Sequence, residues 1–344
     1  MEIASAEVIP YSLPFREPYL TARGQLERRE MILLRVRSAE GIEGLGEAVP
    51  LSLRGGASLA EVEGELRKWA EDPQTPQAGF TLPASCAVQT ALLDIEARVQ
   101  GVPAWKALGA SGAQPVECNA TLAAGEPIRV AERAQEWVEE GFGTFKLKVG
   151  VPKDLAQVAG VRRAVGPGAK LRVDANGAWG PAEAVSRLNV MAGEDLELAE
   201  QPCETLEEMA ELRRRTEVRL AADESVATEL DAQRAVELDA CDVATVKLSK
   251  IGGPREALAI ATAIPVYLSS SLDGPVGIAA AAHLSQALRA RGDAGIAHGL
   301  ATQRLFAETI AARECELHDG FLHLPDGPGL GVEIDDAALE RHRL

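Results

Sequence analysis

The sequence predicts an α/β fold in which a (β/α)8-type barrel, a modified TIM barrel, carries a smaller α+β capping domain. Two observations lead to this prediction. From about residue 115 a unit of short apolar strand, loop and amphipathic helix recurs eight times, with strands beginning roughly 22–29 residues apart, as one such unit requires. The first ~105 residues lack that rhythm, and a chain of 344 residues has room for a large barrel and a second unit.

Eight apolar segments are the expected barrel strands. In chain order they are residues 116–122, 145–149, 170–174, 196–200, 218–223, 243–248, 265–269 and 294–298. The stretches between them have helical spacing. Residues 127–141 place apolar side chains on one face, and residues 205–216 carry acid in the first turn and arginine in the last, as the helix dipole favours. Because periodicity alone does not establish closure, a doubly wound open sheet is the alternative architecture.

Residues 1–105 are expected to form the cap. Segments 2–13 and 31–38 have the pattern of antiparallel strands, and segments 59–71 and 85–101 have that of helices. A mixed unit of this kind differs from the repeating barrel and is expected to pack beside it.

The tail, residues 315–344, does not continue the barrel rhythm, so we expect it to return to the cap and leave residues 106–314 as the barrel. Two glycine-containing cap loops, 18–24 and 50–56, have no evident core role and are free to serve a binding site. The candidates for substrate contact in these loops are Tyr19, Arg23 and Arg54.

Composition narrows the partners. The chain carries a formal net charge of −17, and a field of that sign repels nucleic acid and anionic membranes, so neither is expected to bind. An anionic small molecule must therefore meet a local patch of metal or lysine. Five scattered cysteines without a CxxC pair indicate neither a disulfide framework nor a zinc knuckle. With no signal peptide and no long apolar stretch, the sequence predicts a cytoplasmic protein, and a homo-oligomer is compatible with it.

Three carboxylates end three consecutive expected strands. Asp174, Glu200 and Asp223 stand where strands give way to loops, which is where barrel enzymes place their functional groups. Three oxygen ligands without histidine or thiolate suit a hard cation, so the sequence predicts a Mg²⁺ site in which Mn²⁺ can substitute. The alternative is three independent carboxylates in salt bridges at loop starts.

Two lysines share one face of the strand before these carboxylates. Side chains alternate along a strand, so Lys146 and Lys148 point the same way. If that face is the barrel interior, desolvation and like charge both lower the lysine pKa, which would make a general base near neutral pH. The alternative is a surface strand in which Phe145, Leu147 and Val149 face inward.

A further lysine lies at the end of the sixth expected strand. Lys247 fits this position, and Lys250, a few residues into the loop, is the alternative. Carboxylates flanked by lysines on both sides predict removal of a proton next to a substrate carboxylate, with the metal stabilising the enediolate and a lysine taking the proton.

In these residues the chain resembles the muconate-lactonising-enzyme subgroup of the enolase superfamily, whose sites pair a lysine or histidine base with Mg²⁺. The resemblance covers nearly the whole chain, with its pieces in the expected order. The matching pieces are GTFKLKVG (143–150), LRVDANGAW (171–179), LAEQPC (198–203), LAADES (220–225), VKLSKIGG (246–253) and PGLGVEID (328–335).

The resemblance implies a role for each matching residue. Asp174, Glu200 and Asp223 match the metal ligands. Lys148 matches the acid/base lysine, Lys247 the lysine on the opposite face of the substrate, and Lys146 the neighbour that tunes Lys148. The polar positions around the ligands match Asn176 and Glu224.

Within the subgroup, three stretches are similar to o-succinylbenzoate synthases: residues 21–24, 268–284 and 298–306. The resemblance implies dehydration of 2-succinyl-6-hydroxy-2,4-cyclohexadiene-1-carboxylate to o-succinylbenzoate, a menaquinone precursor. Hydroxyls and the N–H groups of a following helix would receive a substrate carboxylate. The residues expected there are Ser269, Ser270, Ser271 and Gly299. Two departures from that family, Leu248 for a frequent proline and Gly177 for an occasional arginine, bear on substrate contacts.

Other reactions on the same scaffold stay open. A dipeptide epimerase is expected to hold the substrate ammonium with an Asp-x-Asp pair after strand eight, and residues 296–302 contain no acid. An N-succinylamino acid racemase shares the succinyl group with the predicted substrate. A muconate cycloisomerase fits the strand-seven and strand-eight stretches poorly. From other classes come a Schiff-base aldolase, which does not need three carboxylates, and a non-catalytic binding protein. His298 is expected to be structural.

Overall fold

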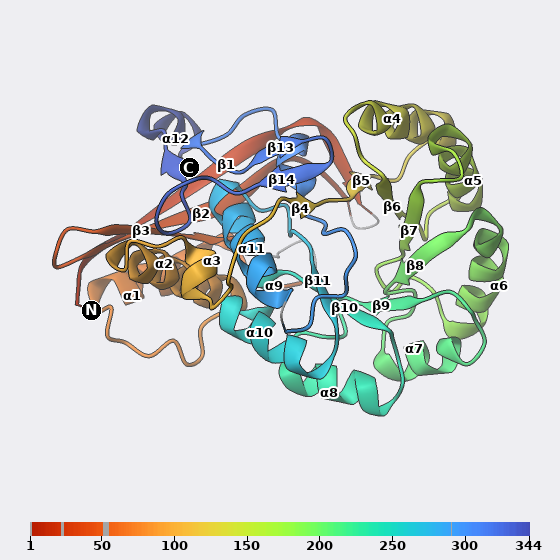
Figure 1. Cartoon of the computed structure of the whole chain (residues 1–344), viewed down its shortest axis with the longest axis horizontal. Coiled ribbons are helices and arrows are strands. Elements are labelled where there is room, and N and C mark those ends of the chain that lie inside the picture. Colours follow the sequence, from red (N-terminus) through yellow and green to blue (C-terminus); the bar gives the residue numbers. More distant parts are fainter. Residues whose placement is uncertain (1, 22–23, 51–54, 290) are drawn as a thin grey trace.

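An antiparallel sheet and three helices form the cap, seen at the left of Figure 1. The computed structural model describes residues 2–21, 24–50, 55–289 and 291–344. The sheet has the order β1 (Ile3–Thr21), β2 (Gly24–Ser38), β3 (Glu43–Ala48). The helices are α1 (Leu59–Glu71), α2 (Leu82–Val99) and α3 (Ala104–Ala107).

The cap has its own core because α1 and α2 bury one apolar face each against the sheet. Leu66 and Trp69 of α1 pack with Ile32 and Leu34 of β2 in one cluster. The helix α2 approaches β3 so closely that a Cβ on Gly46 would lie 1.9 Å from the carbonyl oxygen of Ala87. Only a glycine fits at this contact.

Seven parallel strands curl around the barrel in sequence order, at the right of Figure 1. They are β5 (Ala120–Leu122), β6 (Thr144–Lys148), β7 (Lys170–Asp174), β8 (Leu196–Glu200), β9 (Leu220–Ala222), β10 (Val243–Val246) and β11 (Val266–Leu268). The predicted barrel is confirmed, and the open doubly wound alternative is wrong, because bridges from Cys118 to His298 and from Ser269 to Gly299 join the two edges.

The strand expected at residues 294–298 is not a regular strand, which corrects the prediction of eight. Gly295 adopts a left-handed backbone with φ 67° and interrupts the extended run. The segment still fills the eighth position through bridges at His298 and Gly299. The first expected strand is likewise split, because β4 (Val116–Glu117) leaves the barrel to pair with β14 (Phe321–His323).

Helices follow the barrel strands and cover their outer face (Figure 1). They are α4 (Pro127–Glu139), α5 (Asp154–Val165), α6 (Pro181–Met191), α7 (Leu206–Arg213), α8 (Glu229–Glu237), α9 (Leu248–Ile251), α10 (Pro254–Ala263) and α11 (Pro275–Leu288), with short 3₁₀ turns η2 (Ala192–Glu194) and η3 (Ala301–Leu305). Capping boxes at Thr205 and Thr228 start α7 and α8 by satisfying free N–H groups. No helix in the described part of the chain is long and apolar enough to cross a membrane.

The tail runs back beside the cap. Its elements are β12 (Ala311–Arg313), β13 (Glu316–His318), β14, β15 (Glu333–Ile334) and α12 (Asp336–His342). The N–H of Leu344 donates to the carbonyl of Pro10, and Arg343 forms a bridge with Tyr11, so the end of the chain lies against β1. The division of the chain at residues 105 and 315 stays a prediction.

Glu47, at the end of β3, ties the cap to the barrel. Its carboxylate accepts the N–H groups of Gly274 (2.7 Å) and Val276 (3.3 Å) at the start of α11, and the hydroxyl of Tyr11 (3.0 Å). Burial raises the pKa of Glu47 to about 8, and the charge of Asp273 adds to the rise.

This pKa predicts how stability depends on pH. The folded pKa of Glu47 lies above the ordinary value of 4.5, so its contribution to stability is fully present below that pH and is lost as pH rises through about 8. We expect the free energy of unfolding of Glu47→Gln to fall less over this range than that of the wild type, by on the order of 4 kcal/mol. Urea unfolding at a series of pH values measures it, and parallel curves for the two proteins would contradict it.

Candidate active site

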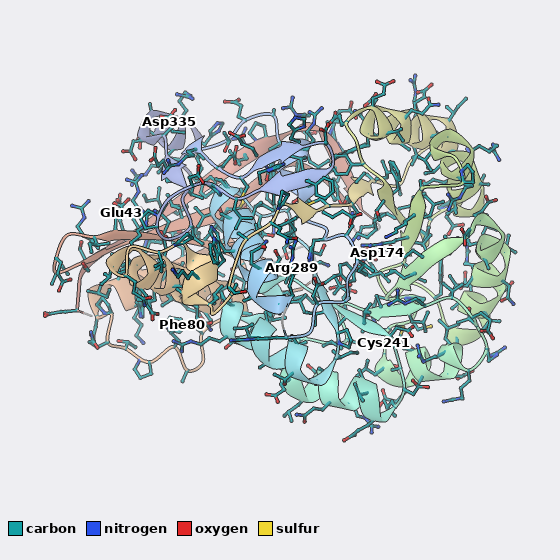
Figure 2. The ribbon with its side chains drawn as sticks, viewed as in Figure 1. Glu43, Phe80, Asp174, Cys241, Arg289 and Asp335 are labelled. Carbon is teal, nitrogen blue, oxygen red and sulfur yellow. The ribbon has the colours of Figure 1, made fainter. Side chains whose placement is uncertain are left out.

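The strand register sets the predicted site residues side by side. Lys148 at the end of β6 pairs with Asp174 at the end of β7, which pairs with Glu200 at the end of β8. Asp223 follows β9 and Lys247 follows β10 directly. Figure 2 places Asp174 among the barrel strands. Five consecutive strands thus deliver one functional side chain each to the same end of the barrel.

Buried ion pairs connect the first lysines to the carboxylates. Lys146 Nζ lies 3.2 and 3.1 Å from the two carboxylate oxygens of Glu200, and Lys148 Nζ lies 2.6 Å from Oδ2 of Asp174. Both carboxylates are fully buried, and Lys146 is only 4% exposed. The alternative in which Lys146 and Lys148 face solvent is therefore wrong.

Two lysines, rather than one, hold Asp223. Lys247 Nζ donates to Oδ2, and Lys250 Nζ donates to Oδ1 at 2.9 Å. Lys247 and Lys250 both line the cavity described below. The sequence predicts Lys247, with Lys250 as the alternative, whereas the structure brings both lysines to the carboxylate of Asp223.

The expected lowering of the lysine pKa is wrong for Lys148. Burial, the largest single influence, would lower the pKa of Lys148, but the charges of Asp174, Tyr19 and Glu200 together outweigh it and raise the pKa above its usual range. Burial would likewise raise the pKa of Asp174, but the charges of Lys148 and Lys146 hold it well below the usual range. The spacing of Lys146 and Lys148 shows their like charges, but it does not show that Asp174 lies in contact with Lys148.

The donor set fits a hard cation by its chemistry. Burial raises the pKa of Glu200, and so do the charges of Asp174 and Asp223, which shows that the three carboxylates sense one another. Their oxygens now accept hydrogen bonds from lysines, and among the described residues no three His, Cys, Asp or Glu side chains are gathered tightly enough to enclose an ion. The carboxylates must therefore turn from their ammonium partners to hold a cation between them.

The polar positions predicted around the ligands are in contact with them. Asn176, with φ 48°, accepts from Lys148 Nζ at 2.9 Å, and its own N–H donates to Asp174 Oδ1 at 3.1 Å. Its Nδ2 donates to Glu224 Oε1 at 3.1 Å, so Glu224 is tied to the same group.

Two buried side chains that position the ligands were not predicted. Gln201, with φ 38°, accepts the N–H of Asp223 at 2.7 Å and fixes the loop after β9. Tyr267 in β11 donates its hydroxyl to Glu200 Oε2 and accepts from Thr245 at 2.7 Å. A polar residue directly after a strand-end carboxylate was the available signal for Gln201, and a tyrosine inside an apolar strand was the signal for Tyr267.

The serine run lies at the predicted place, but the hydroxyl of Ser270 and the N–H groups of the following helix have partners within the protein that the sequence did not predict. Ser270 Oγ accepts from Asp273 N (2.8 Å) and from the hydroxyl of Thr302 (2.7 Å). The buried hydroxyl of Ser271 has no hydrogen-bond partner within the described part of the chain. The expectation that the following helix offers its first N–H groups to a substrate is wrong for Gly274 and Val276, because Glu47 of the cap accepts them.

A cavity of about 290 Å³ is lined by the lysines that bond to the strand-end carboxylates, by Asn176 and Glu224 and by the serine run. Cap and barrel both line it, so the site belongs to neither alone. Its lining is Tyr19, Leu26, Arg29, Pro50, Gly56, Thr121, Lys146, Lys148, Asn176, Glu224, Lys247, Lys250, Ser269, Ser270, Ser271, Leu272 and Thr302. Of the cap candidates, Tyr19 lies here, while Arg23 and Arg54 fall outside the described residues.

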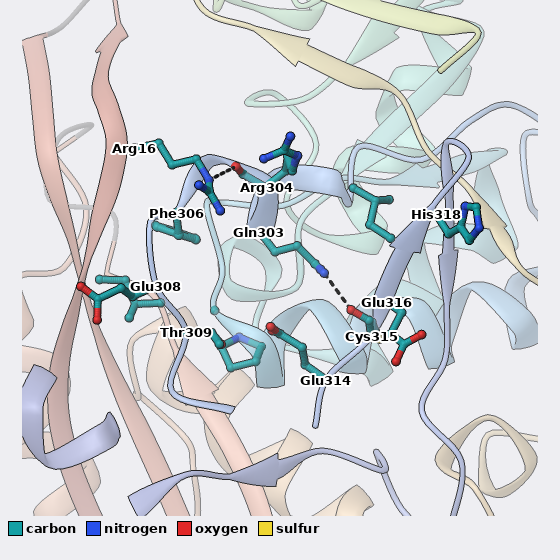
Figure 3. Close-up of a pocket in the computed structure, with 14 residues that line it drawn as sticks. Arg16, Gln303, Arg304, Phe306, Glu308, Thr309, Glu314, Cys315, Glu316 and His318 are labelled. Atoms are coloured by element: carbon teal, nitrogen blue, oxygen red, sulfur yellow. Dashed lines mark hydrogen bonds between the residues drawn. The ribbon is translucent and has the colours of Figure 1, made fainter. Parts of the chain in front are cut away.

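A larger hollow of about 600 Å³ lies beside η3 and the tail (Figure 3). Arg16 donates to the carbonyl of Arg304 at 3.2 Å, and Gln303 donates to that of Cys315 at 2.8 Å, as the dashed lines in Figure 3 show. Its lining contains none of the barrel lysines, whereas Lys146, Lys148, Lys247 and Lys250 line the smaller cavity, which is therefore the candidate active site.

His298 is structural in its contacts, as expected. Its Nδ1 accepts the N–H of Leu268 at 2.9 Å, and burial lowers its pKa to about 4. A neutral ring held in this way joins β11 to the eighth position of the barrel.

Comparisons with known proteins agree with this site and fold. Residues 3–109 match the family described as mandelate racemase / muconate lactonizing enzyme, N-terminal domain, and residues 129–338 match the enolase C-terminal domain-like family. Muconate cycloisomerase 1 of Rhodococcus opacus is 31% identical over 99% of this chain and 98% of that enzyme. The L-Ala-D/L-Glu epimerase of Bacillus subtilis is 30% identical over 84% of this chain and 86% of that enzyme.

Among solved structures, the dipeptide epimerase of Enterococcus faecalis, complexed with Mg and the dipeptide L-Leu-L-Tyr, superposes with a TM-score of 0.89. It is 28% identical, and the match covers 97% of this chain and 100% of that one. Fold and site thus define a barrel enzyme with a two-domain architecture. The chain belongs to the enolase superfamily, in the group of mandelate racemase and muconate lactonizing enzymes. The finer resemblance to o-succinylbenzoate synthases is not carried by these relatives, which are named for cycloisomerisation and epimerisation.

Gly299 offers a test of how closely the eighth position of the barrel packs against the serine run. A Cβ at this position would lie 2.6 Å from the hydroxyl oxygen of Ser269 and 3.2 Å from its Cβ. We expect Gly299→Ala to destabilise the protein by about 1–2 kcal/mol, because the packed bridge must shift. Chemical unfolding measures the loss. Gly64→Ala is the control, since nothing lies within 4 Å of that exposed helical position; an equal effect of both changes would contradict the expectation.

Proposed function

We propose that this chain is a Mg²⁺-dependent enzyme that removes the proton next to a substrate carboxylate, with Lys148 and Lys247 as the proton-transferring groups. The observation that carries the proposal is their placement. Lys148 ends β6 and Lys247 follows β10, with three strands between them in the sheet, and both line one cavity. A substrate lying between them has a lysine on each side.

The carboxylates Asp174, Glu200 and Asp223 would hold the cation, whose charge stabilises the enediolate that forms when the proton leaves. Lys148 gives up part of the attraction that raises its pKa once Asp174 also serves a cation, because the carboxylate charge is then shared. Lys146 and Tyr267, both bonded to Glu200, keep that carboxylate in place.

Epimerisation of a dipeptide or another N-acylated amino acid is the first candidate for the overall reaction. Two lysines on two sides suit proton removal from one face and return to the other. The comparisons support it, since dipeptide epimerases are among the relatives and the solved structures that cover most of the chain.

Dehydration to o-succinylbenzoate is the second candidate, and the cavity lining favours it. Glu224 is the only carboxylate among the described lining residues, and it is engaged by Asn176. A free substrate ammonium therefore has little to bind, while a substrate with two carboxylates meets lysines and hydroxyls. Here Lys148 would remove the proton and return it to the departing hydroxide.

Metal binding tests the carboxylates. We expect Asp174→Asn, Glu200→Gln and Asp223→Asn each to weaken Mg²⁺ binding by at least about tenfold, because a ligand charge is lost. Titration calorimetry with MgCl₂ measures it, and thermal unfolding checks that each variant is folded. Asp242→Asn is the matched control, since that carboxylate pairs with Arg213 away from the cavity. Unchanged binding in all three variants would leave them as structural salt bridges.

Isotope exchange separates the two reactions. In D₂O with Mg²⁺, an epimerase is expected to exchange the α-proton of dipeptides. Lys148→Ala would lose exchange from one stereoisomer and Lys247→Ala from the other, each by roughly 10²–10⁴-fold. Dehydration instead predicts formation of the aromatic product from the cyclohexadiene substrate, abolished by Lys148→Ala. If neither substrate class reacts with the metal-loaded wild type, the proposed chemistry is wrong.

A further inference from the structure

One buried cation in the cavity forms no ion pair with any other described residue. Arg29 in β2 is 8% exposed and lines the cavity together with the lysines of the barrel. Its Nη2 donates to two carbonyl oxygens, of Pro50 at 2.8 Å and of Ser271 at 3.2 Å, which hold the guanidinium between cap and barrel. Neither partner carries a charge.

The hydrogen bonds of Arg29 are incomplete. Its Nε is buried without a hydrogen-bond partner, and no ion pair or hydrogen bond of Nη1 is found among the described residues. A buried guanidinium with unmet donors is costly unless an anion pairs with it. The carboxyls whose charges most affect the pKa of Arg29 are Asp273 and Glu47. Both accept hydrogen bonds from backbone N–H groups at the start of α11 and in the loop before it.

Arg29 also differs from the lysines in what it can recognise. The planar guanidinium binds a carboxylate through two parallel hydrogen bonds, which a lysine does not provide. The lysines of the lining are engaged by Asp174, Glu200 and Asp223, where the reacting carboxylate is expected. Arg29 stands instead with the serine run and Leu26.

We propose that Arg29 is the receptor for a second carboxylate of the substrate, so that the enzyme acts on dianions whose two acid groups lie at opposite ends of the cavity. This inference rests on the proposed function and narrows its substrates. The requirement for a second carboxylate is met by an acidic dipeptide, an N-succinylamino acid and the succinyl-cyclohexadiene acid. A dipeptide with two apolar side chains does not meet it. The role assigned to Arg29 is one of specificity, because it does not reach the reacting atoms.

Binding of matched probes tests the proposal without requiring turnover. One pair is N-acetyl-L-glutamate and N-acetyl-L-glutamine, and the other is N-succinylglycine and its succinyl monoamide. Within each pair only the second carboxylate changes to an amide. In Mg²⁺, we expect calorimetry on the wild type to show a preference for the diacid of roughly ten- to hundredfold in at least one pair. The preferred pair tells whether the second acid lies on the amino acid or on the acyl arm.

Variants connect that preference to Arg29. Arg29→Met is expected to bind the diacid as weakly as the amide, while Arg29→Lys, which keeps the charge and is less disruptive to folding, retains part of the preference. Arg28→Met is the matched control. It removes the same charge from the same strand, but the Arg28 side chain bonds to Ser12.

The outcomes are distinct. Absence of a diacid preference in the wild type, or its persistence in a folded Arg29→Met protein, overturns the role of Arg29. Because these are binding measurements, they stand apart from the exchange experiment: a protein that exchanges α-protons without a diacid preference keeps the proposed function and loses this inference.

Discussion

The whole site depends on burying charge at the ends of adjacent parallel strands. Asp174, Glu200 and Asp223 have no exposed surface, and each would be prohibitively costly without a compensating cation. Lysines from β6 and from the segment after β10 supply that compensation. The parallel register brings the charges to one level, so the same hydrogen-bonded sheet that forms the barrel also fixes the spacing of its reactive groups.

On the proposed function, this compensation would couple metal binding to the reactivity of Lys148. In the ion-paired arrangement, Asp174 raises the pKa of Lys148 and so keeps it protonated, which is the wrong state for a base. A divalent cation held by the same carboxylates would weaken that attraction and add a repelling charge, and both effects would lower the pKa of Lys148.

The sequence allowed much of the barrel and all three strand-end carboxylates to be predicted, because strands and their final residues are local features. Strands at 170–174 and 196–200 have the predicted limits. The prediction of an eighth regular strand was wrong because Gly295 turns the backbone, and the backbone conformation of one glycine inside an apolar run cannot be predicted from the sequence. The pKa of Lys148 and the capture of the α11 N–H groups by Glu47 were wrong because both depend on partners far away in the chain. Arg29 was missed for the same reason, since nothing in β2 itself shows that a barrel loop accepts its guanidinium protons.

The two ends of the cavity carry different kinds of information about the reaction. The strand ends hold the lysines and carboxylates that the proposed α-proton abstraction uses, and relatives named for epimerisation and cycloisomerisation do not select its substrate. The other end is assembled from β2, the serine run and Thr302, and its charge is positive at Arg29. A substrate ammonium placed there would face a cation, whereas a second carboxylate could pair with a guanidinium whose Nε has no hydrogen-bond partner among the described residues. The electrostatics of that end therefore favour dianionic substrates, whichever way the proton is returned.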